Sequence, residues 1–398
     1  MNNTENKIQK GWQASPSFSL HSPETAYSWI EINASALKHN VLAYKSLVGP
    51  STLLAPVIKA DAYGHGILAV GSILNTIEDV GYLCVAHLSE ALTLRKNGIT
   101  KPLVVLSVID IDPALAIEHS IDLIAYDFEV VSYLNQCAQQ LNKKISLHIK
   151  IDTGLSRMGV LWSNADDFIT QCSKLSHCTL TGIFSHFANS EGPDKTFAKL
   201  QLSRFKSVIL KAASQGIHFK FAHISSSAGH IVLPEAYCTL TRLGIGLYGL
   251  WPSSINKQES LARQSNFYLE PVMEWKTKIN QIKDIPAGSF VGYDLTHTVT
   301  RDSRIAILPI GYHDGYDRRL SNKAKVKING HYAPVIGRVA MNLTMIDITD
   351  IPDVKKTDTV TLLGADEMIS AETLAQLCGT INYEFVSRIN PRIRRIVI

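Results

Sequence analysis

Apolar and polar positions alternate in blocks from residue 27 to about residue 262. Short apolar runs, typical of buried strands, are separated by segments in which apolar residues recur at helical spacing. In residues 127–143, Val131, Leu134, Ala138 and Leu141 recur every three or four positions. The predicted strands are LLAPVIKA (53–60), VGYLCVAH (80–87), PLVVLS (102–107), IDLIAY (121–126), ISLHIKID (145–152), TLTGIFSH (179–186), FKFAHIS (219–225) and LTRLGIGLYG (240–249). Eight strands alternating with helices predict an α/β fold, a parallel (β/α)8 barrel of the TIM type.

An open, doubly wound parallel sheet is the alternative architecture. Such sheets usually carry a G-x-G-x-x-G phosphate-binding turn after their first strand, and no such turn follows residues 53–60. The segment GIGLYG at 244–249 fits the pattern, but it lies inside the last apolar run. The pattern therefore favours the closed barrel.

From about residue 263 the pattern changes to β-segments joined by tight turns. Asn329-Gly330 lies between two alternating runs and predicts a hairpin. Ser370 and Gly379 bracket a predicted helix. The terminal NPRIRRIVI predicts a last strand with solvated arginines. We thus expect a flexible leader over residues 1–26, a barrel over 27–262 and a C-terminal mostly-β domain over 263–398.

Composition narrows the class of protein. A formal charge of +4 over 398 residues gives no argument for nucleic-acid binding. No apolar run approaches the roughly 18 residues of a membrane span, and the polar leader does not resemble a signal peptide. Six scattered cysteines with no zinc-type spacing predict reduced core thiols and no metal site. These features predict a cytoplasmic protein with no nucleic-acid or membrane partner.

Polar residues of types used in catalysis lie where the predicted barrel strands end. Lys59 ends the first strand, Lys150 the fifth and His186 the sixth, and Ser225 to Ser227 follow the seventh. Active sites of β/α barrels are built at that end. A partly buried lysine loses proton affinity and becomes a nucleophile or base. Pyridoxal-phosphate enzymes use such a lysine to bind the cofactor. Hydroxyls in SSSAGH and backbone amides in RLGIG offer a phosphate cradle, although serine clusters and glycine turns are usually plain loops.

The motif VIKADAYGHG resembles the cofactor-lysine motif of the alanine racemases. The similarity continues through HIKIDTGLSRMGV, GIFSHFANSE, LTRLGIGLYGL, VGYDLT, LPIGYHDGYDRRL, GRVAMN and GTINYEF, in the family's order and spacing. It covers essentially the whole chain after the leader. The resemblance implies pyridoxal-5'-phosphate-dependent, two-base interconversion of L- and D-alanine, which supplies D-alanine for peptidoglycan, in a homodimer with shared sites.

The resemblance also implies residue roles. Lys59 would hold the cofactor as an imine and act as one base, and Tyr293 of the partner subunit would act as the other. Arg242 would face the ring nitrogen, where arginine keeps its own proton and so favours racemisation over other pyridoxal chemistry. Further implied roles are phosphate binding by Tyr63, Ser227, Gly244, Ile245 and Tyr383, cofactor contact by His186, substrate-carboxylate binding by Arg157 and the backbone of Met341, carbamylation of Lys150, and a substrate corridor lined by Tyr312, Arg318, Arg338, Glu191 and Ile381.

Three positions depart from the residues common in the family. Ser226 stands where asparagine is common, Asn342 where aspartate is common, and Ala340 where cysteine or serine often occurs. They bear on substrate preference and rate. The alternatives are a racemase acting on serine or a broader set of amino acids, and a single-barrel pyridoxal-phosphate carrier, against which the VGYDLT and GRVAMN segments argue. A related decarboxylase would carry cysteine and aspartate at its second-domain site, and neither stands at Tyr293 or Ala340.

Overall fold

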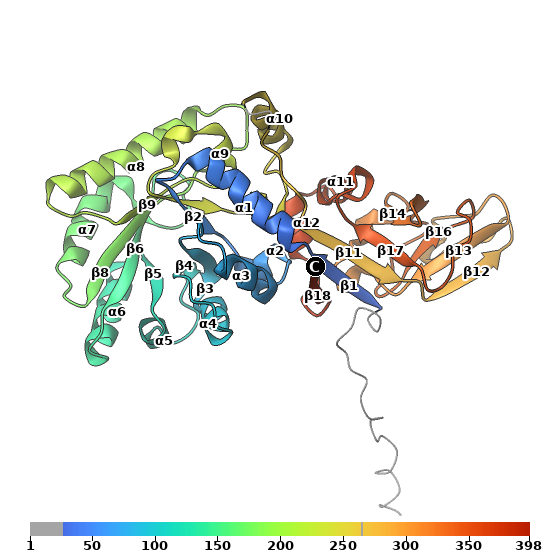
Figure 1. Cartoon of the computed structure of the whole chain (residues 1–398), viewed down its shortest axis with the longest axis horizontal. Coiled ribbons are helices and arrows are strands. Elements are labelled where there is room, and N and C mark those ends of the chain that lie inside the picture. The colour runs from blue at the N-terminus through green and yellow to red at the C-terminus, as the bar shows by residue number, and fades with distance from the viewer. Residues whose placement is uncertain (1–26, 264–265) are drawn as a thin grey trace, which may run out of the picture.

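The computed structural model of the chain describes residues 27–263 and 266–398, so the predicted leader lies outside the described residues. Eight parallel strands form a closed barrel (Figure 1). They are β2 (Leu53–Pro56), β3 (Leu83–His87), β4 (Leu103–Val108), β5 (Ile121–Ala125), β6 (Ile145–Asp152), β8 (Cys178–Phe184), β9 (Phe221–His223) and β10 (Leu240–Leu243). The predicted (β/α)8 barrel is confirmed.

Backbone hydrogen bonds close the barrel. The strands from β3 to β9 pair in sequence order, and β10 pairs with β2. A parallel bridge between Val57 and Cys84 joins β2 to β3. Between β9 and β10, the amide of Arg242 donates to the carbonyl of Ser225 at 3.4 Å. The carboxyl ends of all eight strands therefore meet at one mouth.

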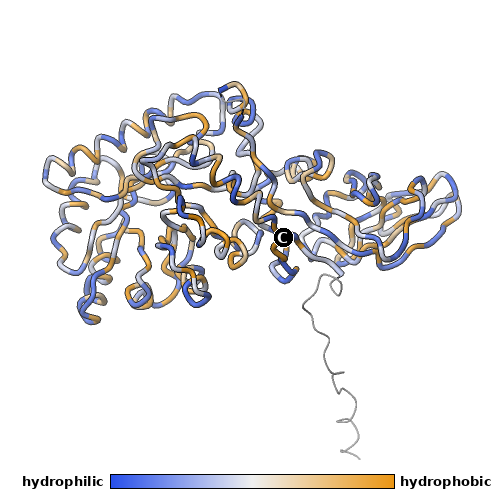
Figure 2. Tube along the Cα trace, viewed as in Figure 1, coloured by the Kyte–Doolittle hydropathy of each residue, from blue (hydrophilic) through white to orange (hydrophobic). Residues whose placement is uncertain are grey.

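Helices cover the outside of the barrel, most of them through an apolar stripe, whereas α10 buries the polar Asn256 and Ser260. Asn33 and Asp127 cap α1 and α6 through their side chains. Val131, Leu134 and Ala138 of α6 are buried, as their spacing predicts. Hydrophilic positions gather at the turns and outer faces (Figure 2). The helices are α1 (Ala34–Val48), α3 (Ile67–Asn75), α4 (Leu88–Lys96), α5 (Ala114–Glu118), α6 (Phe128–Gln140), α7 (Ala165–Ser173), α8 (Thr196–Ser214), α9 (Ser227–Val232) and α10 (Ser254–Arg263).

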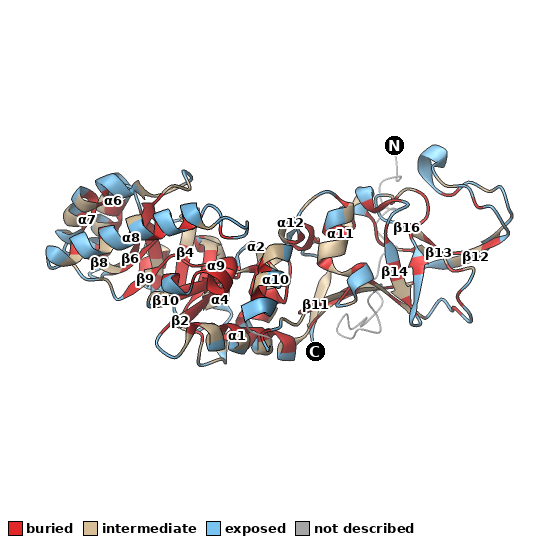
Figure 3. Cartoon of the chain, turned by 90° about the horizontal axis from the view of Figure 1, so that it is seen from above, coloured by how far each residue is buried: buried red, intermediate tan, exposed pale blue. Residues whose placement is uncertain are grey.

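The second domain extends to one side of the barrel (Figures 1 and 3). It holds a six-stranded sheet of order β15-β14-β17-β11-β1-β18 and a three-stranded sheet of order β12-β13-β16. The elements are β1 (Ser28–Ile32), β11 (Met273–Lys278), β12 (Gln281–Ile285), β13 (Ser303–Leu308), β14 (Lys325–Ile328), β15 (His331–Pro334), β16 (Thr344–Asp347), β17 (Thr359–Leu363), β18 (Arg394–Val397), α11 (Ala371–Leu377) and α12 (Asn382–Ser387). The mostly-β character is confirmed.

Local signals in this domain behave as the sequence predicts. Asn329-Gly330 turns β14 into β15, with Ile328 opposite His331. Ser370 caps α11 by accepting a hydrogen bond from the amide of Thr373 at 3.2 Å, and Gly379 follows the helix at φ +66°. In the described chain no helix is both long and apolar enough to cross a membrane.

Two strands near the chain ends make contacts that the sequence does not reveal. The residues of β1 fall within the range expected for the barrel, but β1 pairs with β11 and β18 in the six-stranded sheet. β18 forms as predicted, yet the expectation of solvated arginines is wrong for Arg395, whose side chain is only 7% exposed. Its guanidinium donates to the carbonyl of Gly64 at 2.8 and 3.2 Å and lies 3.8 Å from Asp61. Pairing with β1 lays β18 over the turn that follows Lys59.

Candidate active site

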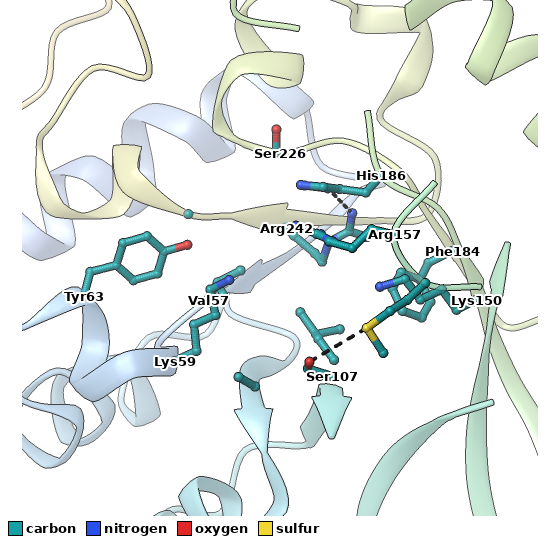
Figure 4. Close-up of a pocket in the computed structure, with 14 residues that line it drawn as sticks. Val57, Lys59, Tyr63, Ser107, Lys150, Arg157, Phe184, His186, Ser226 and Arg242 are labelled. Atoms are coloured by element: carbon teal, nitrogen blue, oxygen red, sulfur yellow. Dashed lines mark hydrogen bonds between the residues drawn. The ribbon is translucent and has the colours of Figure 1, made fainter. Parts of the chain in front are cut away.

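A cavity of about 260 Å³ opens at the mouth of the barrel. Lys59 and Tyr63 enter it from the segment after β2, and Arg242 enters from β10, which pairs with β2 (Figure 4). Lys150 and Phe184 enter from β6 and β8, and His186 enters from the segment that follows β8. The lining residues are Val57, Lys59, Tyr63, Ala86, Leu106, Ser107, Lys150, Arg157, Met158, Phe184, His186, Ser226, Arg242 and Gly244. The structure thus gathers seven of the predicted site residues in one place: Lys59, Tyr63, Lys150, Arg157, His186, Arg242 and Gly244.

Lys59 does not lie on the strand itself. β2 ends at Pro56, and Lys59 begins a one-turn segment, α2 (Lys59–Tyr63), in which residues 60–63 all have φ between +52° and +55°. Left-handed conformation costs an L-residue roughly 1–2 kcal/mol, so four in a row persist only if the surroundings hold them. This turn sends Lys59 and Tyr63 toward the cavity.

Neighbouring side chains hold this left-handed turn. Glu90 accepts a hydrogen bond from the amide of Ala60 at 2.7 Å. Asp61 accepts one from the amide of Ile67 at 2.8 Å, while Arg395 binds the carbonyl of Gly64. Gly64 must be glycine because a Cβ there would lie 2.1 Å from the carbonyl oxygen of Val386 in α12. The turn is therefore fixed by α3, α4, α12 and β18 together.

The cavity is strongly cationic. Partial desolvation by the walls lowers the pKa of Lys59, and the nearby Arg157 lowers it further. Burial lowers the pKa of Lys150 to about 8, with Arg242 and Arg157 as the next causes. Four cations around one cavity favour an anionic ligand, and perturbed pKa values in a cleft are typical of functional sites.

Arg242 is held rigidly on β10. Its guanidinium donates to the carbonyls of Ser185 at 2.7 Å and Ile224 at 3.1 Å. It also donates to the ring nitrogens Nδ1 of His186, at 3.2 Å, and of His223. Burial lowers the pKa of Arg242 to about 10, which leaves it protonated at neutral pH. Burial, followed by the adjacent Arg242, holds the pKa of His186 and of His223 well below 6.5, so both rings are neutral.

Ser227 and Gly244 form a small polar cradle beside Tyr63. The hydroxyl of Ser227 accepts hydrogen bonds from the amides of Gly244 at 2.9 Å and Gly246 at 3.1 Å. A Cβ on Gly244 would lie 3.2 Å from the Tyr63 hydroxyl and 3.6 Å from the Ser227 hydroxyl. Only glycine leaves this space open for a ligand.

Other predicted residues lie outside the cavity lining. Ser227 lies behind Gly244, and the side chain of Ile245 is buried in the core. Tyr383 packs 6.3 Å, ring to ring, from Tyr63, and its hydroxyl donates to Glu191 at 3.1 Å. Tyr383 and Glu191 therefore stand close to the cavity without lining it.

The predicted residues of the second domain are not brought to this cavity by their own chain. Tyr293 is 68% exposed and Met341 is 55% exposed. The 3-10 turn η5 (Tyr293–Leu295) is braced by Asp294, which accepts a hydrogen bond from Arg318 at 3.2 Å and forms an ion pair with Arg338, whose Nε also lies 3.2 Å from the carboxylate. Tyr312 and Ile381 are also exposed. These exposed residues all belong to the second domain, which extends to one side of the barrel (Figure 3).

Several contributors were not predicted from the sequence. Phe184, Ser107 and Met158 line the cavity, and His223 holds Arg242. The sequence does carry one sign of a further buried histidine. His148 and Lys150 are two residues apart on β6, so both side chains lie on the same face of the strand.

Comparisons with known proteins agree with the geometry. Residues 32–252 match the family model described as alanine racemase, N-terminal domain, and residues 272–397 match alanine racemase, C-terminal domain. The alanine racemase of Syntrophobacter fumaroxidans is 39% identical over 364 residues, covering 90% of this chain and 94% of the relative. That of Methanococcus maripaludis is 37% identical over 374 residues, with 93% and 98% covered.

A solved structure gives the same result. The alanine racemase of Clostridium difficile in complex with cycloserine superposes with a TM-score of 0.86 at 34% identity, covering 94% of this chain and 96% of that one. Both domains and the three-dimensional arrangement thus match over 90% or more of the chain, and the chain belongs to the alanine racemase family.

Proposed function

We propose that this protein is a pyridoxal-phosphate-dependent alanine racemase, an isomerase that interconverts L- and D-alanine and supplies D-alanine for peptidoglycan. The observation that carries the proposal is the pairing, across one cationic cavity, of a lysine on a constrained turn with a rigidly held arginine. Family membership supports the same activity.

The residues present fit pyridoxal phosphate. At the edge of the cavity, Gly244 lies beside the hydroxyls of Tyr63 and Ser227, and this gathering of polar groups supports a phosphate-binding role. Tyr63, Ser227, Gly244, Ile245 and Tyr383 are the proposed phosphate-binding residues, and His186 supports Arg242 at the ring. Lys59 has the lowered pKa needed to form a covalent link to a carbonyl carbon. When bound, the cofactor supplies an electron sink for the charge left at Cα after proton removal.

The residues of the protein then have separate roles in the reaction. Lys59 accepts the α-proton of D-alanine at its Nζ and returns it to the same face. Arg242 donates hydrogen bonds and keeps its proton, because a guanidinium with a pKa of about 10 does not give it up at neutral pH. Arg157, together with the backbone of Met341 of the partner subunit, would position the substrate carboxylate.

A second base on the opposite face completes racemisation without turning the substrate over. We assign this role to Tyr293 of the partner subunit, since Tyr293 is exposed and its own chain does not bring it to the cavity. The protein is therefore proposed to be a homodimer in which the second domain of one subunit covers the barrel mouth of the other. The corridor residues Tyr312, Arg318, Arg338, Glu191 and Ile381 would lie along the entrance.

Lys150 is proposed to be carbamylated. With a pKa of about 8, about a tenth of its amine is neutral at pH 7 and able to react with carbon dioxide. The carbamate replaces a positive charge by a negative one beside Arg157 and Arg242, which relieves their repulsion. Protein equilibrated with ¹³C-bicarbonate should show a carbamate carbonyl signal by NMR that is absent from Lys150→Ala. The same spectrum for both proteins would contradict the assignment.

The activity and the cofactor link can be tested together. Purified protein with pyridoxal phosphate should convert each enantiomer of alanine into the other, with serine as the control for the broader-range alternative that Ser226 at the cavity keeps open. Borohydride should then fix the cofactor to the peptide containing Lys59, and Lys59→Ala should lose both label and activity. Label on another lysine would overturn the assignment of Lys59, and faster turnover of serine would favour the alternative.

A further inference from the structure

A chain of hydrogen bonds runs from Arg242 away from the cavity, through the barrel core. Beyond His223, whose Nδ1 contacts Arg242, the Nε2 of His223 lies 3.0 Å from Nδ1 of His148. The Nε2 of His148 lies 3.2 Å from Oδ2 of Asp122, which also accepts a hydrogen bond from the hydroxyl of Tyr82 at 2.9 Å. Arg242 is thus connected to a carboxylate through two imidazole rings.

The direction of this chain is determined by its two ends. A guanidinium only donates, so Nδ1 of His223 must be an acceptor and its Nε2 must carry the proton. Nδ1 of His148 then accepts, and its Nε2–H donates to Asp122, an acceptor. Every hydrogen bond points from the cation to the carboxylate, and both rings are neutral with the proton on Nε2.

The chain of hydrogen bonds crosses the barrel from one end to the other. Arg242 and His223 are near the carboxyl ends of β10 and β9, His148 is in the middle of β6, and Asp122 is the second residue of β5. Both histidines are fully buried, while the side chain of Asp122 is 14% exposed at the amino end of the strands. The chain therefore links the active-site mouth with the opposite end of the barrel.

The core is shaped around these rings. A Cβ on Gly182 would lie 2.2 Å from Nδ1 of His148, so the ring occupies the space that the glycine leaves. The register of β6 and β8 shifts between Leu147 and His148. Phe184 stacks on His223 at 4.8 Å with an interplanar angle of 3°. Packing of this kind fixes the orientation of both imidazole rings, so the hydrogen-bonded connection is held in place by the core.

Charge explains why such a chain is useful. Arg242 is buried, and among the described residues no carboxylate lies within 4 Å of its guanidinium. A buried cation without a counter-charge is strongly destabilising, and aligned hydrogen bonds polarise one another in a low-dielectric core. Arg95 is a second cation at the same end of the barrel as Asp122. Its guanidinium, however, donates hydrogen bonds to the carbonyls of Ile99 at 2.6 Å and Lys101 at 2.8 Å and not to that carboxylate.

We propose that Asp122 is a positioning residue for the reaction, acting through His148 and His223 to orient the Arg242 guanidinium and to supply its distant counter-charge. This inference rests on the proposed function, since Arg242 is assigned there to the cofactor ring. Tyr82 supports the arrangement by giving the carboxylate a second donor.

The direction of the chain is testable without the reaction. Full-length protein labelled with ¹⁵N-histidine, with and without pyridoxal phosphate, should show two buried rings that carry the proton on Nε2. The ring of His223 should stay neutral at neutral pH, because burial and Arg242 hold its pKa well below 6.5. Asp122→Asn should change the ¹⁵N shifts of these two rings. A proton on Nδ1 of either ring, or a cationic ring, would overturn the inference.

The role in the reaction is tested on the holoenzyme. Asp122→Asn keeps the size and an acceptor oxygen but removes the charge, so kcat for alanine should fall about tenfold with KM within about twofold, and the absorption band of the bound cofactor should shift. Asp166→Asn is the matched control, because Asp166 pairs with Lys211 outside the barrel at 2.9 Å and should change nothing.

The other possible outcomes also decide whether Asp122 has the positioning role. A folded Asp122→Asn enzyme with an unchanged band and kcat close to that of the wild type overturns the positioning role, while the proposed function stands. If Asp122→Asn fails to fold, Tyr82→Phe removes one donor to the same carboxylate, and it should produce a smaller change in the band and in kcat. An unchanged Tyr82→Phe enzyme would then overturn the role. Wild-type protein that neither binds pyridoxal phosphate nor racemises alanine would remove the proposed function itself.

Discussion

Tyr293→Phe is expected to stop α-proton exchange from L-alanine while leaving exchange from D-alanine in place. If Lys59 and Tyr293 of the partner subunit face opposite sides of Cα, each serves one enantiomer, and the family resemblance assigns Tyr293 to L-alanine. Loss of a general base typically lowers a rate about a hundred- to ten-thousand-fold. Lys59 is untouched by the substitution, so D-alanine should still exchange its α-proton with retention of configuration.

The measurement is incorporation of deuterium at Cα of each enantiomer in deuterated water, followed by NMR. Tyr332→Phe is a suitable control, because Tyr332 is another partly exposed tyrosine of the same domain, on β15, where it hydrogen-bonds Asp366. It should leave both exchange rates unchanged. Equal loss for both enantiomers in Tyr293→Phe would mean that Tyr293 orders the site without acting as a base, and the two-base mechanism would be abandoned.

Mixing two inactive variants should restore activity if the sites are shared between subunits. Lys59→Ala removes the base in the barrel, and Tyr293→Phe removes the base in the second domain. A dimer containing one chain of each kind has one site with both substitutions and one site with neither. With random exchange in an equal mixture, about a quarter of wild-type activity should return, because half the dimers are hybrids with one intact site.

The matched control mixes Lys59→Ala with a double variant carrying both Lys59→Ala and Tyr293→Phe. No combination of these chains forms an intact site, so activity should stay at background. Subunit exchange is verified separately with differently tagged chains. Background activity in the first mixture despite proven exchange would place both bases in one chain and contradict the homodimer with shared sites.

Much of the fold follows from local patterns in the sequence. The alternation of apolar runs with helical stripes predicts eight barrel strands, and all eight form. Asn329-Gly330 and Ser370 act through bonds within a few residues, so the hairpin and the helix cap can be assigned from the sequence alone. The sequence likewise identifies Lys59, Lys150 and His186 near the strand ends, since side chains at the carboxyl ends of barrel strands converge whatever the loops do.

Other features depend on residues far apart in the chain. Arg395 looks like a surface charge in its own segment, and only the pairing of β18 with β1 lays it over the carbonyl of Gly64. The left-handed turn after Lys59 is unfavourable locally and exists because Glu90, Arg395 and α12 hold it.

The hydrogen-bond chain behind Arg242 shows the same division most clearly. The sequence alone established which residue types each strand carries and which of them share a face, because strand periodicity is a local property. It could not show that Asp122, His148 and His223 meet end to end. Their contacts depend on the register of β5, β6 and β9 and on the space left by Gly182, and register is determined by packing across the closed barrel.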